Sequence, residues 1–249
     1  MVVGIGASAG GLDVFRALVR ALAPAHGTAF ILVQHLDPNH GSLLVELLTG
    51  STTLPIREAT DGMRVEAENI YVIPPGRYLA VHDGRLQLSE PGVPHGARLP
   101  FDFLLRSLAK ECGPRAACVV LSGTGADGSL GLQAVKSAGG LVIVQDPDEA
   151  AYDGMPRNAV LTGAADLVLP LVKIPLALLK HRDDLSSDEP KTSPAPHRQD
   201  HGPFSAIIEL VREKTAHDFR PYKSGTLTRR IERRMGLAGM RTTDAKGYL

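Results

Sequence analysis

The chain has 249 residues, of which 43% are hydrophobic, and its formal net charge at pH 7 is zero. These values fit one globular domain with an appendage. No apolar run approaches the roughly 18 residues that a membrane span needs, and no basic region precedes the first apolar strand as in a signal peptide. The two cysteines, Cys112 and Cys118, lack metal-ligand spacing and are expected to be buried, reduced thiols. We therefore expect a cytoplasmic protein without direct membrane insertion.

In residues 1–182, strand patterns alternate with helix patterns. In chain order they predict a strand at 2–5, a helix at 12–22, a strand at 29–33, a helix at 43–48, a strand at 70–73, a hairpin at 78–88 that turns at Asp83-Gly84, a helix at 101–111, a strand at 117–121, a helix at 130–138 and a strand at 141–144. Strands separated by helices indicate βαβ units. We expect an α/β domain with a doubly wound, mainly parallel sheet and helices on both faces.

The zero net charge hides a division of the chain into three parts. Residues 1–182 carry 15 Lys and Arg against 17 Asp and Glu, and residues 183–202 carry 2 against 5. Residues 203–249 carry 10 against 5, so their net charge is +5. The middle part is rich in proline and charge and is expected to be a flexible linker. In the last part, apolar residues return at helical spacing, which predicts a small all-α element.

Three residues with reactive side chains follow predicted strands. Ser8 follows the first strand, His35 the second, and Asp127 the strand at 117–121. Function in an open parallel sheet sits at the carboxyl ends of its strands, so we expect these side chains to converge. A hydroxyl, an imidazole and a carboxylate there would serve as nucleophile, general base and orienting group. Taken singly, each also fits a structural role, such as a helix N-cap.

The turn around Ser8 has two competing interpretations. Gly6, Ser8 and Gly10 form G-x-S-x-G, which exposes a serine at the end of a strand. The same segment also contains G-x-G-x-x-A, a nucleotide-binding loop. A dinucleotide site needs an acidic residue after the second strand, where this chain has Gln34-His35. The order Ser, His, Asp also differs from the Ser, Asp, His order of α/β-hydrolases.

A metal site would be another use of the segment after the second strand. His35, Asp37 and His40 are potential ligands. Pro38 lies between them and no fourth ligand is evident, which disfavours a metal. We expect neither a metal nor another cofactor.

Several motifs, in their order along the chain, resemble those of the chemotaxis protein-glutamate methylesterases, the CheB family. The resemblance covers about residues 1–180. It rests on Gly6-Ala7-Ser8-Ala9-Gly10-Gly11, Gln34-His35, Gly62-Met63 with Tyr71-Val72-Ile73-Pro74-Pro75-Gly76, Leu121-Ser122-Gly123-Thr124-Gly125-Ala126-Asp127-Gly128 and Gly154-Met155-Pro156-Arg157. It implies hydrolysis of glutamyl methyl esters on chemoreceptors and, in some members, deamidation of receptor glutamines.

The resemblance also implies a role for each site residue. Ser8 is similar to the family's nucleophile, His35 to its general base and Asp127 to the residue that orients the base. The backbone N–H groups of Ala9 and Thr124 match the oxyanion hole. The family often has methionine at the position of Thr124, a difference that affects the pocket but not the backbone. Family members typically carry a receiver domain before the esterase; here the first strand begins at residue 2, so phosphorylation control in cis is expected to be absent.

The last part of the chain resembles the N-terminal helical domain of the chemoreceptor methyltransferases, the CheR family. The match rests on Phe204-x-x-Ile207-Ile208, Tyr222-Lys223 and residues 229–235, which include Arg229, Arg230, Arg233 and Arg234. Like-charge pairs at i,i+4 destabilise a helix, so this cluster favours an acidic partner over simple solvation. The family resemblance implies a methylated receptor helix as that partner, and few aromatic residues interleave the charges as they would on a nucleic-acid surface. No S-adenosylmethionine loop is present, so no transferase activity is expected. The alternative function is an inactive receptor-binding scaffold.

Overall fold

The structure is a computed structural model that describes residues 1–22, 27–34, 43–92 and 98–187. The chain divides into two units, Met1–Pro190 and Lys191–Leu249, and all described residues belong to the first. The expected small all-α element and most of the expected linker therefore lie outside the described residues.

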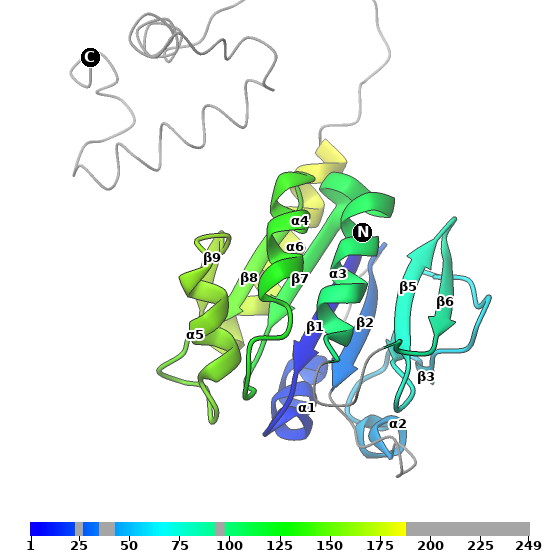
Figure 1. The fold of residues 1–249 in the computed structure, drawn as a ribbon, viewed down its shortest axis with the longest axis horizontal. Helices are drawn as coiled ribbons and strands as arrows, with labels where there is room; N and C mark the ends of the chain where they lie inside the picture. Colours follow the sequence, from blue (N-terminus) through cyan, green and yellow to red (C-terminus); the bar gives the residue numbers. More distant parts are fainter. Residues whose placement is uncertain (23–26, 35–42, 93–97, 188–249) are drawn as a thin grey trace, which may run out of the picture. The chain divides into compact units, whose positions relative to one another are not determined.

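A seven-stranded parallel sheet forms the centre of the first unit (Figure 1). Its strands are β1 (Val2–Ala7), β2 (Ala29–Gln34), β3 (Ile56–Glu58), β4 (Ile70–Val72), β7 (Ala116–Val120), β8 (Leu141–Gln145) and β9 (Leu167–Leu169). Their order is β3-β4-β2-β1-β7-β8-β9, and each neighbouring pair is parallel. The predicted doubly wound α/β fold is confirmed.

Helices cover both faces of this sheet. One face packs against α1 (Gly11–Ala21), α2 (Leu44–Leu48) and α6 (Ile174–Ser187). The other packs against α3 (Pro100–Cys112), α4 (Ser129–Ser137) and α5 (Gly154–Leu161), as Figure 1 shows. Strands buried on both faces need continuous apolar runs, and β2 and β7 have them.

Two glycines in β1 allow α3 to approach the sheet closely. A Cβ atom on Gly4 would lie 3.0 Å from Leu108 Cδ1, and one on Gly6 would lie 2.7 Å from Phe101 Cγ. The alternate residues of β1 face the opposite core, where Val3 and Ile5 are fully buried. The alternation of glycine with branched residues thus places α3 directly over the strand that leads to Ser8.

The predicted hairpin is also confirmed. Strands β5 (Tyr78–His82) and β6 (Arg85–Ser89) pair antiparallel. Asp83 and Gly84 both have positive φ, 48° and 68°, as a two-residue type I′ turn requires. The hairpin packs on α3, whose Ser107 hydroxyl accepts a hydrogen bond from the Val81 N–H at 3.0 Å.

The structure differs from the sequence-based expectation in four elements. The strands β3 and β9 and the helices α5 and α6 were not predicted. The helix α6 continues to Ser187, so residues 183–187 of the expected linker are helical. Two short 3-10 helices, Gly113–Arg115 and Leu171–Lys173, complete the described part.

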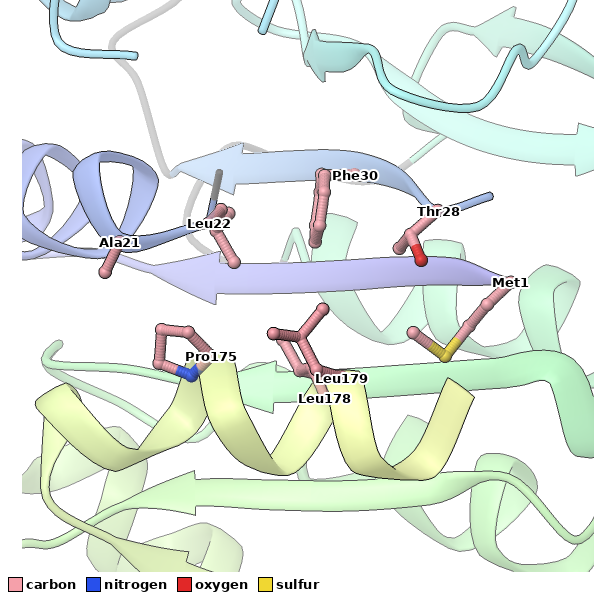
Figure 2. A pocket seen from close by; sticks show the side chains of 8 residues that line it. All are labelled: Met1, Ala21, Leu22, Thr28, Phe30, Pro175, Leu178 and Leu179. Atoms are coloured by element: carbon pink, nitrogen blue, oxygen red, sulfur yellow. The ribbon is translucent and has the colours of Figure 1, made fainter. Parts of the chain in front are cut away.

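A small apolar pocket lies beside the start of β1 (Figure 2). Met1, Thr28 and Phe30 line one side and Pro175, Leu178 and Leu179 of α6 line the other. Because Met1 and Thr28 precede β1 and β2, this pocket is at the amino-terminal edge of the sheet, away from Ser8. None of the described helices is long and apolar enough to span a membrane.

Candidate active site

The order of the strands creates a switch point between β1 and β7. From β1 the chain passes to β2 on one side, whereas from β7 it passes to β8 on the other. The carboxyl ends of two strands whose connections diverge in this way border a crevice where ligands bind. Ser8 follows β1 at this edge, as the sequence pattern predicted, and it is half-buried.

The turn after Ser8 leads directly into α1. The Gly11 N–H donates to the Ser8 carbonyl at 2.9 Å. Gly10, the N-cap residue, has φ 71°, a left-handed conformation that suits glycine. The Ala9 N–H donates no hydrogen bond to any other described residue. A free N–H beside a nucleophile at the start of a helix is suited to an oxyanion.

The loop after β7 lies against Ser8. The Ser8 N–H donates to the Ser122 carbonyl at 3.1 Å. A Cβ atom on Gly123 would lie 2.9 Å from both the Ser8 N and Cβ atoms, so glycine permits this contact. The next residue, Thr124, is exposed, and its N–H has no hydrogen-bond partner in the described part of the chain. Two unused N–H groups, of Ala9 and Thr124, therefore belong to the two segments that meet at Ser8.

A buried serine joins the loops around this edge. Ser122 is 2% exposed, and its hydroxyl donates to the Ala9 carbonyl at 3.2 Å and accepts from the Tyr152 N–H at 3.0 Å. Its own N–H donates to the Gln145 side chain at 2.9 Å. Ser122 and Gln145 were not predicted as site residues. The signal was a polar residue, Gln145, at the end of the apolar run of β8.

Asp127, in the loop before α4, places its carboxylate at the start of α3, a contact that the sequence did not suggest. It is 4% exposed, and its two carboxylate oxygens accept the N–H groups of Phe101 at 2.9 Å and Asp102 at 3.0 Å. The Phe101 ring lies next to Gly6 and Gly128, so it packs between the strand of Ser8 and the loop of Asp127. Each carboxylate oxygen has a second lone pair, so Asp127 is not restricted to these two hydrogen bonds.

The remaining predicted site residues lie outside the described residues. These are His35, Arg229, Arg230, Arg233 and Arg234. The alternative metal ligands Asp37 and His40 are also outside them. Among the residues that the structure does describe, the one group with metal-like spacing is His82, Asp83 and Glu111, near the hairpin turn.

Comparisons with known proteins show the family to which this fold belongs. The family model of the CheB methylesterase matches residues 3–178, and that of the CheR methyltransferase all-alpha domain matches residues 203–245. The catalytic domain of the Thermotoga maritima CheB methylesterase superposes with a TM-score of 0.67 at 30% identity, covering 72% of this chain and 97% of that domain.

Two named relatives and one uncharacterised protein cover different shares of the chain. The protein-glutamate methylesterase FrzG of Myxococcus xanthus is 36% identical over 73% of this chain and 54% of its own length. A protein-glutamate methylesterase/protein-glutamine glutaminase of Anaeromyxobacter dehalogenans is 37% identical over 71% and 52%. An uncharacterised 104.1 kDa protein of Rhodobacter capsulatus is 34% identical over 83% of this chain but 23% of its own length. The chain thus spans about half the length of the two methylesterases and belongs to the CheB methylesterase family.

Proposed function

We propose that this chain is a serine esterase that hydrolyses glutamyl methyl esters on chemoreceptors and deamidates receptor glutamines. The observation that carries the proposal is the position of Ser8. It follows β1 at the switch point of the sheet, where the segments that contain the unused N–H groups of Ala9 and Thr124 meet. Relatives named for both activities support the pair of reactions.

In the proposed mechanism, the Ser8 hydroxyl attacks the ester carbonyl while His35, oriented by the Asp127 carboxylate, takes its proton. The N–H groups of Ala9 and Thr124 stabilise the oxyanion of the tetrahedral intermediate. His35 then gives the proton to the leaving methoxide, so methanol departs and an acyl-serine remains. Water, deprotonated by His35, hydrolyses the acyl-serine to the glutamate. With a glutamine substrate, ammonia leaves instead of methanol.

The test compares Ser8→Ala with the wild type in release of methanol from a methylated receptor and of ammonia from its glutamine form. Loss of the nucleophile is expected to lower both rates by about 10³-fold or more. Ser137→Ala is the matched control, because this exposed serine is at the far end of α4 and should keep full activity. Wild-type release by Ser8→Ala would refute the nucleophile, and no release by the wild type would favour the inactive scaffold.

We also infer that Arg229, Arg230, Arg233 and Arg234 bind an acidic segment of the receptor. These four arginines account for most of the +5 charge of residues 203–249. Exposed charges chiefly set association rate and salt sensitivity. Changing all four to alanine should weaken receptor capture most clearly at low salt, while hydrolysis of a small activated ester stays unchanged. Equal loss in both assays, or no loss of capture, would contradict a docking role.

A further inference from the structure

The N-termini of α3 and α4 lack capping side chains of their own. The N-cap residues are Leu99 for α3 and Gly128 for α4, and neither makes a side-chain cap hydrogen bond. A helix leaves its first N–H groups without intrahelical partners, so buried helix starts need acceptors from elsewhere. Carboxylates supply them here: Asp102 of α3 serves the start of α4, and Asp127, in the loop before α4, serves the start of α3.

Each of the two helix starts is thus capped by a carboxylate from the other segment, and we call these contacts the exchanged caps. Asp127, one residue before the N-cap of α4, accepts the Phe101 and Asp102 N–H groups of α3. Asp102, in the first turn of α3, accepts the Gly131 N–H of α4 through Oδ1 at 2.5 Å. Both residues are 4% exposed. A buried charge-assisted hydrogen bond at a helix start is among the stronger polar contacts in proteins.

Glycines allow the two helix starts to approach closely. A Cβ atom on Gly131 would lie 2.6 Å from Leu105 Cβ and 3.2 Å from the Asp102 Cα atom. One on Gly128 would lie 2.6 Å from the Phe101 ring. Because the packing on both sides is tight, we expect a change at Asp102 to shift the start of α4, and with it Asp127.

We propose that Asp102 is a positioning residue for Asp127: its carboxylate fixes the start of α4, and thereby holds the Asp127 carboxylate where the general base needs it. This inference rests on the proposed esterase function. Asp102 does not contact the substrate in this proposal; it supports the Asp127 carboxylate through the exchanged caps.

The environment of Asp102 indicates which replacement should be tolerated. Burial raises the pKa of its carboxyl group; the Gly131 N–H opposes this shift, and the charge of Asp127 adds to it. The Oδ2 atom is buried without a hydrogen-bond partner, so the structure uses one acceptor atom and not the full carboxylate. An asparagine retains that acceptor without the charge, whereas an alanine loses it.

The experiment measures kcat and KM for methanol release from a methylated receptor. Asp102→Ala should lower kcat by about 10- to 100-fold, as loss of a supporting residue does, with little change in KM. Asp102→Asn should restore kcat to within about 3-fold of the wild type, because Oδ1 can still accept the Gly131 N–H. If Asp102→Ala does not fold, Asp102→Ser, too short to reach Gly131, takes its place.

Asp166→Ala is the matched control. This half-buried carboxylate accepts the Val142 N–H at 3.0 Å and pairs with Lys136, at the amino-terminal edge of the sheet. Its loss should reduce thermal stability and leave kcat unchanged. A comparable fall in kcat for both variants would mean that general destabilisation explains the Asp102 effect, and would overturn the proposal.

A double-mutant cycle separates action through Asp127 from an independent role. If Asp102 acts through Asp127, then Asp102→Ala lowers kcat little in an Asp127→Ala background. Additive losses, or an Asp102→Asn as slow as Asp102→Ala, would overturn the proposal. Ser8→Ala distinguishes failure of the proposed esterase function from failure of the positioning role. Wild-type activity in Ser8→Ala refutes the esterase function itself. An inactive Ser8→Ala together with a fully active Asp102→Ala refutes the positioning role alone.

Discussion

The contact between Gly6 and Phe101 gives a sharp test of the packing that underlies the site. Replacing Gly6 by alanine would place a Cβ atom 2.7 Å from Phe101 Cγ and closer still to two other ring atoms. Phe101 is 1% exposed, and its N–H is bound to Asp127, so the ring has little room to move. We expect Gly6→Ala to destabilise the domain.

The size of the effect follows from comparison with Gly4. Adding a methyl group to a filled core typically costs about 1–3 kcal/mol. At Gly4 the new Cβ atom would lie 3.0 Å from Leu108 Cδ1 and 3.3 Å from Leu105 Cδ2, both ends of flexible side chains. Replacing glycine also lowers the entropy of the unfolded chain, worth about 0.4–1 kcal/mol, so Gly4→Ala should be close to neutral.

Thermal unfolding of the two variants is the assay. For a domain of this size, about 1–3 kcal/mol corresponds to a fall in Tm of about 2–12 °C for Gly6→Ala, and Gly4→Ala should stay near the wild type. Adding Phe101→Leu to Gly6→Ala should recover part of the loss, because leucine lacks the ring that meets the new methyl group. Equal Tm values for Gly6→Ala and Gly4→Ala would refute the close contact between α3 and β1.

Two further predictions concern buried titratable groups. The folded state raises the pKa of Asp102, chiefly by burial, so wild-type stability declines as pH rises through that folded pKa. The free energy of unfolding of Asp102→Asn, relative to that of the wild type, should therefore increase with pH above about 4 and then level off. Urea unfolding at several pH values measures it. A free-energy difference between the two proteins that does not change with pH would contradict this prediction. Burial also raises the pKa of the Cys118 thiol, which is 0% exposed in β7. An alkylating reagent should therefore modify Cys118 of the native protein far more slowly than the half-buried Cys112, and peptide mapping measures the two rates.

The sequence predicted the elements with strong apolar signals and missed those with weak ones. The strands β2 and β7 are continuous buried runs, so their pattern is evident. In contrast, β3 has one apolar residue, Ile56, because an edge strand needs to bury little. The helices α5 and α6 each have a proline in the first turn, at Pro156 and Pro175, which resembles a loop in sequence but is tolerated there.

Within the site, the strand ends were predictable and the exchanged caps were not. Ser8 follows an apolar strand in a glycine-rich turn, so its place at the carboxyl edge follows from local pattern. The bond between Asp102 and Gly131 joins residues 29 positions apart, and it depends on how two helices pack rather than on spacing along either one. A polar residue within the apolar pattern of α3 was the one local sign, since buried aspartates require partners.

Asp127 has two roles, one in the proposed chemistry and one in the packing of α3. In the proposed mechanism its carboxylate orients the base, yet the same two oxygens accept the N–H groups that begin α3. Removing it would leave those buried donors unsatisfied, a loss distinct from any effect on the base. Activity lost in an Asp127 variant therefore combines two causes, whereas Ser8 makes no such side-chain contact with another described residue. Ser8→Ala is for this reason the cleaner measure of catalysis.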